Sequence, residues 1–170
     1  LLARLNRQNK NLDAAANAYE QAVSLVGTEG TIAAEFKDLL IEQKLLGEDP
    51  RWDYYIGALS GYSESQNDPR KRSAIQLEIA QVLADEMELV DRALHTLQRA
   101  LAADTENPAL RTELAKRLRL SGHFPQALIE LRRLLEIDVT KIETWSAILE
   151  CFQGLKRADE ATLAMAPLVA

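Results

Sequence analysis

The sequence predicts an all-α fold, an α-α superhelix in which antiparallel helix pairs stack into a right-handed solenoid. Three observations predict it. Short strings that contain alanine recur at a constant spacing, an amphipathic stretch precedes each string, and aromatic residues make up only 5% of the 170 residues. The core must therefore be built mainly from Leu, Ile, Val and Ala, a mixture that favours helices over strands.

The recurring strings place an alanine at a fixed interval. Ala93, Ala127 and Ala161 follow one another at 34 residues, and Ala15 begins a fourth copy near the start of the chain. An apolar residue lies four positions after each alanine: Tyr19, Leu97, Leu131 and Met165. A constant period of this length indicates one structural unit that is repeated and that must stack on its neighbours to bury its apolar face.

A second amphipathic helix is predicted before each of the last three alanines. Before Ala127 the apolar residues recur at i, i+4, i+5 and i+8, the spacing of one buried stripe: Leu110, Leu114, Ala115 and Leu118. Similar stripes precede Ala93 and Ala161: Ile75, Ile79, Ala80 and Leu83, and Trp145, Ile148, Leu149 and Phe152. Each repeat is therefore a pair of helices.

Start and stop signals bound these helices. Asp68 and Asn107 each precede a proline, which is typical of a capping side chain followed by the first helical position. Residues 140–143 have the pattern of a capping box, with Thr140 as the cap. We expect three glycines to end helices in the left-handed conformation: Gly47, Gly122 and Gly154.

The segment 30–73 is longer than the period and is a degenerate repeat. We expect a helix over 31–46 and a second over 50–62. Gly57 and Gly61 take the place of the usual alanine, which predicts a still closer helix contact. Most of the aromatic residues gather here and form either a local core or an interface: Trp52, Tyr54, Tyr55 and Tyr62.

The pattern resembles the tetratricopeptide repeat (TPR). Ala15, Ala93, Ala127 and Ala161 match the small residue that is nearly always present in the second helix of that family. Further matches are the small residues Ala3, Ala80 and Ala115, the aromatic residues Trp145 and Tyr19, and the turn glycine Gly122. Thr105 and Val139 replace the proline that usually ends a repeat, and Arg111 stands where tryptophan is usual.

The resemblance implies a single TPR-like domain over 1–170, which we interpret as a fragment of a longer protein. Its repeats would be 1–29 (partial), 30–73 (degenerate), 74–107, 108–141 and 142–170 (partial). Pro167 should end or kink the last helix, leaving Leu168 and Val169 as uncovered apolar surface. We expect a bacterial, cytoplasmic protein, although targeting segments would lie outside a fragment.

Composition and motifs exclude several classes of function. The net charge of −6 argues against nucleic acid as a partner, and no apolar run is long enough to span a membrane. The spacings of metal ligands, phosphate-binding loops and catalytic triads are all missing, so we expect no enzyme, no cofactor and no metal. We interpret Cys151 as a core residue, and His95 and His123 as solvated or structural.

The TPR resemblance implies that a protein or peptide lies in the concave groove lined by the first helices. The positions that would contact it are Thr112, Lys116 and Arg119 in one repeat, and Glu143, Ser146, Glu150 and Gln153 in the next. Lys116, Arg117, Arg119 and Arg111 form a basic cluster. That cluster is either a site for an acidic peptide or a solvated face, and both interpretations stay open.

Two functions therefore compete. The first is a scaffold or adaptor that binds a peptide or protein segment in the groove. The alternative is self-association, as in a homodimer, or assembly within a larger protein that could carry an enzyme domain. It predicts exposed apolar surface at Leu168 and Val169 or around Trp52 and Tyr55.

Overall fold

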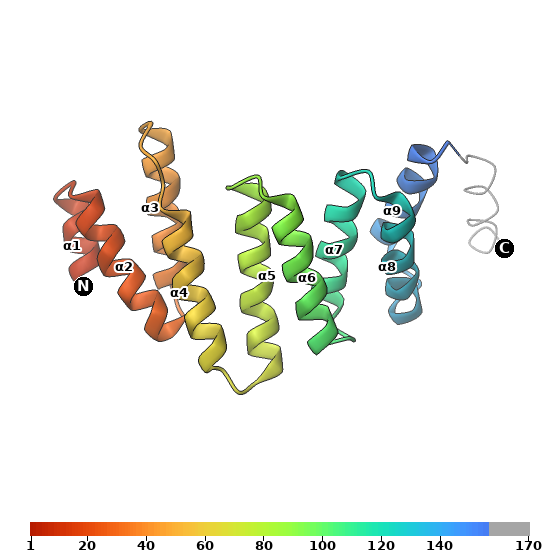
Figure 1. The fold of residues 1–170 in the computed structure, drawn as a ribbon, viewed down its shortest axis with the longest axis horizontal. Helices are drawn as coiled ribbons and strands as arrows, with labels where there is room; N and C mark the ends of the chain where they lie inside the picture. Colours follow the sequence, from red (N-terminus) through yellow and green to blue (C-terminus); the bar gives the residue numbers. More distant parts are fainter. Residues whose placement is uncertain (157–170) are drawn as a thin grey trace. The chain divides into compact units, whose positions relative to one another are not determined.

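A computed structural model describes residues 1–156, which form nine α-helices and no strand (Figure 1). The helices are α1 (Leu2–Gln8), α2 (Leu12–Val26), α3 (Ile32–Leu45), α4 (Trp52–Ser65), α5 (Pro69–Asp85), α6 (Val90–Ala103), α7 (Pro108–Leu120), α8 (Phe124–Ile137) and α9 (Ile142–Gly154). The predicted all-α helical-repeat fold is confirmed. The helices fall into two compact units, Leu1–Leu89 with α1–α5, and a second that begins at Val90 and holds α6–α9.

The predicted helix starts at the two prolines are confirmed. The side chain of Asp68 accepts a hydrogen bond from the backbone N–H of Arg70 at 2.9 Å. The side chain of Asn107 accepts from the backbone N–H groups of Ala109 and Leu110 at 3.0 and 3.1 Å. Each cap satisfies donors that the first turn of a helix leaves without a partner.

The capping box predicted at 140–143 is wrong. Helix α9 begins at Ile142 with Lys141 as its N-cap, and no side chain caps it. The hydroxyl of Thr140 instead donates to Asp138 Oδ1 at 2.6 Å, and its backbone N–H donates to the same oxygen at 3.0 Å. A nearby acceptor on the preceding loop thus takes the side chain that would otherwise have capped the helix.

The first helix of each repeat ends in a left-handed residue. Gly47 and Gly122 have φ of 78° and 76°, as predicted. The prediction for Gly154 is wrong, because it is the last residue of α9 and the left-handed residue is Lys156, with φ of 57°. A Cβ on Gly154 would run into the ring of Phe124, so this glycine serves close packing instead.

The core of the first unit combines alanines with a chain of aromatic rings. Ala15 on α2 is fully buried, as expected for a residue where two helices approach. The ring of Phe36 lies 5.9 Å from that of Tyr19 and 5.5 Å from that of Tyr55, and Trp52 packs edge-on against Tyr55 at 6.0 Å. These four rings join α2, α3 and α4.

The role predicted for the two glycines of α4 is wrong. A Cβ added at Gly57 or Gly61 would meet no atom within 4 Å, and both residues face solvent. The small residue that turns inward is Ala58, whose exposed fraction is 7%. The helix is rotated so that its aromatic and alanine stripe is buried, which leaves the glycines on the outside.

The second unit is built as the 34-residue pattern predicts. Ala93, Ala127 and Leu110 are fully buried, and α7 packs against α6 and α8. Ala115 is 2% exposed, and Cys151 on α9 is fully buried. Ala161, Met165, Pro167, Leu168 and Val169, on which sequence predictions were made, lie outside the described residues.

Candidate functional site

The first helices of two consecutive repeats in the second unit, α7 and α9, contact each other. The residues predicted to bind a partner lie along these helices, and we call them the α7–α9 face. Six of the seven are exposed and Arg119 is partly exposed: Thr112, Lys116, Arg119, Glu143, Ser146, Glu150 and Gln153. Their exposure follows from the amphipathic pattern, because the opposite stripe of each helix is buried.

One ion pair crosses the α7–α9 face. Arg119 Nη1 donates to Glu150 Oε2, joining the C-terminal half of α7 to that of α9. The side chains are 25% and 49% exposed. Lys116 extends from the same side of α7, with its Nζ 3.7 Å from Glu113 Oε1. The face therefore presents both signs of charge beside small polar side chains.

The predicted basic cluster is corrected by the burial of two of its members. The side chains of Arg111 and Arg117 are 9% and 6% exposed. Arg111 Nη1 lies 2.5 Å from Glu130 Oε2, and Arg117 Nη2 lies 2.5 Å from Glu113 Oε1. A cation that is buried and paired within the chain is not available to a ligand. Of the four basic residues, only Lys116 and Arg119 therefore remain on the surface.

The first unit repeats this arrangement with four ion pairs. Each joins the first helices of successive repeats, with the cation on the earlier helix and the carboxylate on or just after the later one: Arg4–Glu35 at 2.6 Å, Arg7–Glu42 at 2.9 Å, Lys37–Glu78 at 2.9 Å and Lys44–Glu86 at 3.2 Å. Exposed pairs of this kind add little to stability, because water and salt screen their charges. The charges along this side of the unit are thus largely matched within the chain.

Two tyrosine hydroxyls extend these ion pairs into the aromatic core. Tyr19 donates to Glu35 at 3.0 Å, and Tyr55 donates to Glu78 at 3.2 Å. The hydrogen bond from Arg4 lowers the pKa of Glu35 to about 2, and bonds from Thr31 and Tyr19 lower it further against the opposing effect of burial. The carboxylate is therefore ionised over the whole physiological range.

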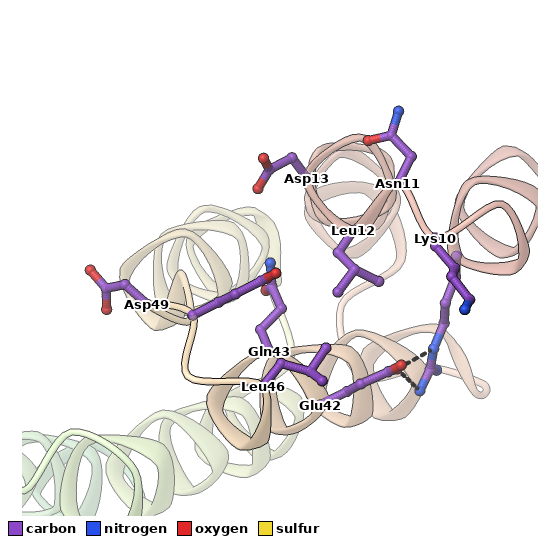
Figure 2. A pocket seen from close by; sticks show the side chains of 10 residues that line it. Lys10, Asn11, Leu12, Asp13, Glu42, Gln43, Leu46 and Asp49 are labelled. Carbon is purple, nitrogen blue, oxygen red and sulfur yellow. Dashed lines mark hydrogen bonds and ion pairs between the residues drawn. The ribbon is translucent and has the colours of Figure 1, made fainter.

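A cleft of about 690 Å³ opens in the first unit, where the turns that end α1 and α3 approach the start of α2 (Figure 2). Its lining comes from these three helices and the loops next to them: Arg7, Lys10, Asn11, Leu12, Asp13, Glu42, Gln43, Leu46, Glu48 and Asp49. Arg7 and Glu42 are paired with each other at one end. The cleft was not predicted from the sequence.

Gln43 is the one deeply buried polar side chain that lines this cleft. It is 2% exposed, and its Oε1 atom has no hydrogen-bond partner. Figure 2 shows the side chain rising from α3 toward Leu12 on α2. One sequence signal could have found it, because Gln43 continues the stripe of Phe36, Leu39 and Leu40, and a polar residue in an apolar stripe needs an explanation.

The aromatic segment 52–62 contributes a local core, one of the two interpretations left open above. Trp52 is 3% and Tyr55 1% exposed, so neither is available to a partner. Tyr54 is 40% exposed and lies under the guanidinium of Arg51, 3.7 Å from the ring centre. Tyr62 packs against Gly27, where a Cβ would overlap its ring.

Residues that could carry chemistry are dispersed in the part of the chain that the structure describes. Cys151 is buried, and burial raises the pKa of its thiol. His95 and His123 are both exposed. No group of three or more His, Cys, Asp or Glu side chains within residues 1–156 could hold a metal ion. No helix in this range is long and apolar enough to cross a membrane.

Comparison with known proteins relates the chain to others through its fold. No protein-family model matches the sequence, and no curated protein matches it. The crystal structure of MamA superposes with a TM-score of 0.58 at 17% identity, covering 95% of this chain and 82% of that one. YrrB, described as a TPR protein with an unusual peptide-binding site, superposes with a TM-score of 0.58 at 16% identity, covering 94% and 77%. The fold is that of TPR proteins.

Proposed function

We propose that this TPR-fold chain binds a segment of a protein partner on the α7–α9 face and does not act as an enzyme. The observation that carries the proposal is that, of the seven polar or charged side chains on two adjoining first helices, six are exposed and Arg119 is partly exposed. YrrB, which shares the fold, is described as having a peptide-binding site. Fold alone does not assign a function, so the residues must be tested directly.

The chemistry of the face favours a peptide of mixed polarity. Thr112 and Ser146 offer hydroxyls that donate and accept hydrogen bonds, and Gln153 offers an amide. Lys116 and Glu143 provide one charge of each sign at positions open to solvent. The Arg119–Glu150 pair holds its two charges together. The further proposal that the peptide is acidic rests on the positive charges of Lys116 and Arg119.

A peptide library displayed on phage and selected on the immobilised chain tests this proposal. The variant Thr112→Arg/Ser146→Arg places two bulky cations on the face and should abolish binding of the enriched peptides. The matched control, Gln126→Arg/Glu136→Arg, places the same groups on exposed positions of α8 and should leave binding unchanged. Circular dichroism checks that both variants are folded.

Three results decide the matter. Enriched peptides that bind the control but not the Thr112→Arg/Ser146→Arg variant support the α7–α9 face. Peptides that bind both variants equally would place the site elsewhere. If no peptide is enriched, the face does not recognise linear segments. A loss of affinity in high salt would support an acidic peptide, because ion pairs at an exposed face are screened.

Self-association is a second candidate that one surface favours. Ile137, Val139 and Ile142 are 50%, 55% and 78% exposed around the turn between α8 and α9. Trp145 Nε1 donates to the carbonyl of Val139 at 2.8 Å, which holds this turn against α9. Sedimentation equilibrium of the chain, with and without Ile142→Lys, tests it: a dimer that the substitution dissociates supports it, and a monomer at all concentrations rejects it.

We further propose that binding takes place in the cytoplasm. The described residues contain one cysteine, Cys151, and it is buried and free. A chain without a disulfide framework fits a reducing compartment. Fusing the chain to a fluorescent protein within its full-length gene product and imaging the cells would test this location, and an envelope signal would contradict it.

A further inference from the structure

We propose that the cleft of the first unit binds an arginine side chain of a peptide partner, at a site separate from the α7–α9 face. Three observations point to this ligand. The cleft contains a buried acceptor without a partner, more carboxylates than cations, and exposed aliphatic surface beside them. The site goes beyond the function proposed above, because it lies on other helices and recognises a defined chemical group.

The buried acceptor specifies a donor from the ligand. Gln43 Oε1 is out of reach of solvent and accepts no hydrogen bond within the described residues. Leaving such an atom without a donor destabilises the fold, because the oxygen has lost its water and gained no hydrogen bond in return. A ligand that enters the cleft and displaces the atoms covering this oxygen can bring an N–H group to it and recover that cost. An acidic ligand in its ionised form has no donor to offer.

The charge around Gln43 specifies a cation. The lining holds four carboxylates and two cations, and Arg7 and Glu42 neutralise each other. Arg51 interacts electrostatically with Asp13. The carboxylates of Glu48 and Asp49 have no hydrogen bond or ion pair within residues 1–156. In Figure 2, Asp13 and Asp49 lie to the left of Leu12, whereas Lys10 lies to its right. The cation therefore belongs at the Asp49 end.

The aliphatic lining and the volume of the cleft favour a cation at the end of a long aliphatic side chain. Leu46 is 64% exposed, and Leu12 lies across the cleft from it on α2. A methylene stem that lies along both leucines would cover them while its charged head reaches the carboxylates. A volume of about 690 Å³ is within the range of roughly 300–1,000 Å³ that is typical of ligand sites. It has room for a short peptide segment.

Arginine suits this site better than lysine. Its guanidinium is planar and carries five N–H donors in a fixed geometry. It can donate to Gln43 Oε1 and to a carboxylate at the same time, whereas the ammonium of lysine is a compact and strongly hydrated charge. The acceptors in the cleft are one amide oxygen and several carboxylates. A guanidinium, which has several N–H donors, can therefore form more hydrogen bonds with them than an ammonium group.

Calorimetric titration of the 170-residue chain with a capped pentapeptide, one arginine flanked by leucines and alanines, tests the proposal. We expect saturable binding that weakens at least about tenfold when norleucine replaces the arginine. Gln43→Met keeps the length of the side chain and removes the acceptor, and it should also weaken binding about tenfold. Asp49→Asn should weaken it severalfold and reduce its salt dependence.

Control variants separate this site from others. Glu64→Gln removes an exposed carboxylate at the far end of α4 and should bind the peptide as the native chain does. Thr112→Arg/Ser146→Arg should bind the peptide equally well. A test that rejects binding on the α7–α9 face can therefore be distinguished from one that rejects binding in this cleft. Thermal unfolding of each variant confirms that it is folded.

Four outcomes would overturn the proposal. They are absence of saturable binding at about 1 mM peptide, equal affinity of the norleucine peptide, and undiminished binding by Gln43→Met. The fourth concerns the source of the guanidinium: if agmatine, which carries the group without a peptide, binds as tightly as the pentapeptide, the occupant is a small molecule and not a protein segment.

Discussion

Arg111 Nη1 donates to Glu130 Oε2 at 2.5 Å and joins α7 to α8 at a place where both side chains are largely buried. The same guanidinium donates from Nη2 to the carbonyl of Thr105 at 2.5 Å. Tryptophan is usual at this position in TPR proteins, so a paired cation here replaces an aromatic contact between the helices of one repeat. Two consequences of the pairing can be measured.

Removing one partner of this pair should destabilise the fold strongly. Glu130→Leu leaves the guanidinium of Arg111 buried without its counter-ion, and we expect a loss of about 3 kcal/mol in the free energy of unfolding. The double variant Arg111→Met/Glu130→Leu replaces both charges with apolar groups and should lose less than Glu130→Leu alone. With Arg111→Met as the other single variant, urea denaturation of the four proteins in this cycle gives the coupling energy between the two side chains. Additive losses would contradict an energetic coupling.

The stability of the first unit should fall in acid partly through Glu35. Its pKa is about 2 in the folded chain, compared with an ordinary value of 4.5, chiefly because Arg4 donates to it. A depressed folded pKa stabilises the fold above the unfolded value and loses that contribution as pH falls from about 4.5 to about 2. Glu35→Gln should flatten this part of the stability profile, measured by urea denaturation from pH 2 to 6. An unchanged slope, equal to that of Glu64→Gln, would contradict the assignment.

Two charged residues occupy a backbone conformation that favours glycine. Lys10 and Glu88 have φ of 58° and 57°, each in the turn after a first helix. A left-handed residue with a Cβ costs about 1–2 kcal/mol, and glycine avoids this strain. Part of the gain is lost, because glycine also gives the unfolded chain more conformational freedom. We expect Lys10→Gly and Glu88→Gly each to raise stability by about 0.5–1 kcal/mol. Asn9→Gly, at φ of −80°, should lower it, and a gain there would refute the explanation.

Glycines in two helices should respond to alanine in opposite directions. Gly57 faces open space within α4, so Gly57→Ala should stabilise the chain by about 0.5–1 kcal/mol through helix propensity. Gly154→Ala should destabilise it by about 1–3 kcal/mol, because the new Cβ meets the ring of Phe124. Thermal unfolding measures both changes. Stabilisation by Gly154→Ala would show that the Phe124 ring moves aside without cost.

Much of the fold could be predicted because it depends on local patterns. The 34-residue spacing of Ala93 and Ala127 and the capping residues Asp68 and Asn107 act within one helix pair, so periodicity and propensity are enough to place them. The failures lie where a neighbouring side chain competes. Asp138 takes the hydroxyl of Thr140 away from the predicted capping box. Phe124 explains Gly154, a contact between residues far apart in sequence.

The candidate sites divide in the same way. Exposure along the α7–α9 face follows from the helical period, whereas the pairing of Arg119 with Glu150 depends on how one repeat stacks on the next. The burial of Arg111 and Arg117 could not be read from their charge, since only tertiary contacts with Glu130 and Glu113 make it tolerable.

By itself, the sequence determined the all-α class, the period and the buried alanines Ala15, Ala93 and Ala127, because these follow from the geometry of single helices and of one repeated pair. Only the tertiary structure decided which charges face solvent and which are paired. It also brought Leu12, Gln43 and Asp49 together around one cleft. The physical reason is that a cleft is formed by turns from different helices, and the distances between them are set by packing and not by spacing along the chain.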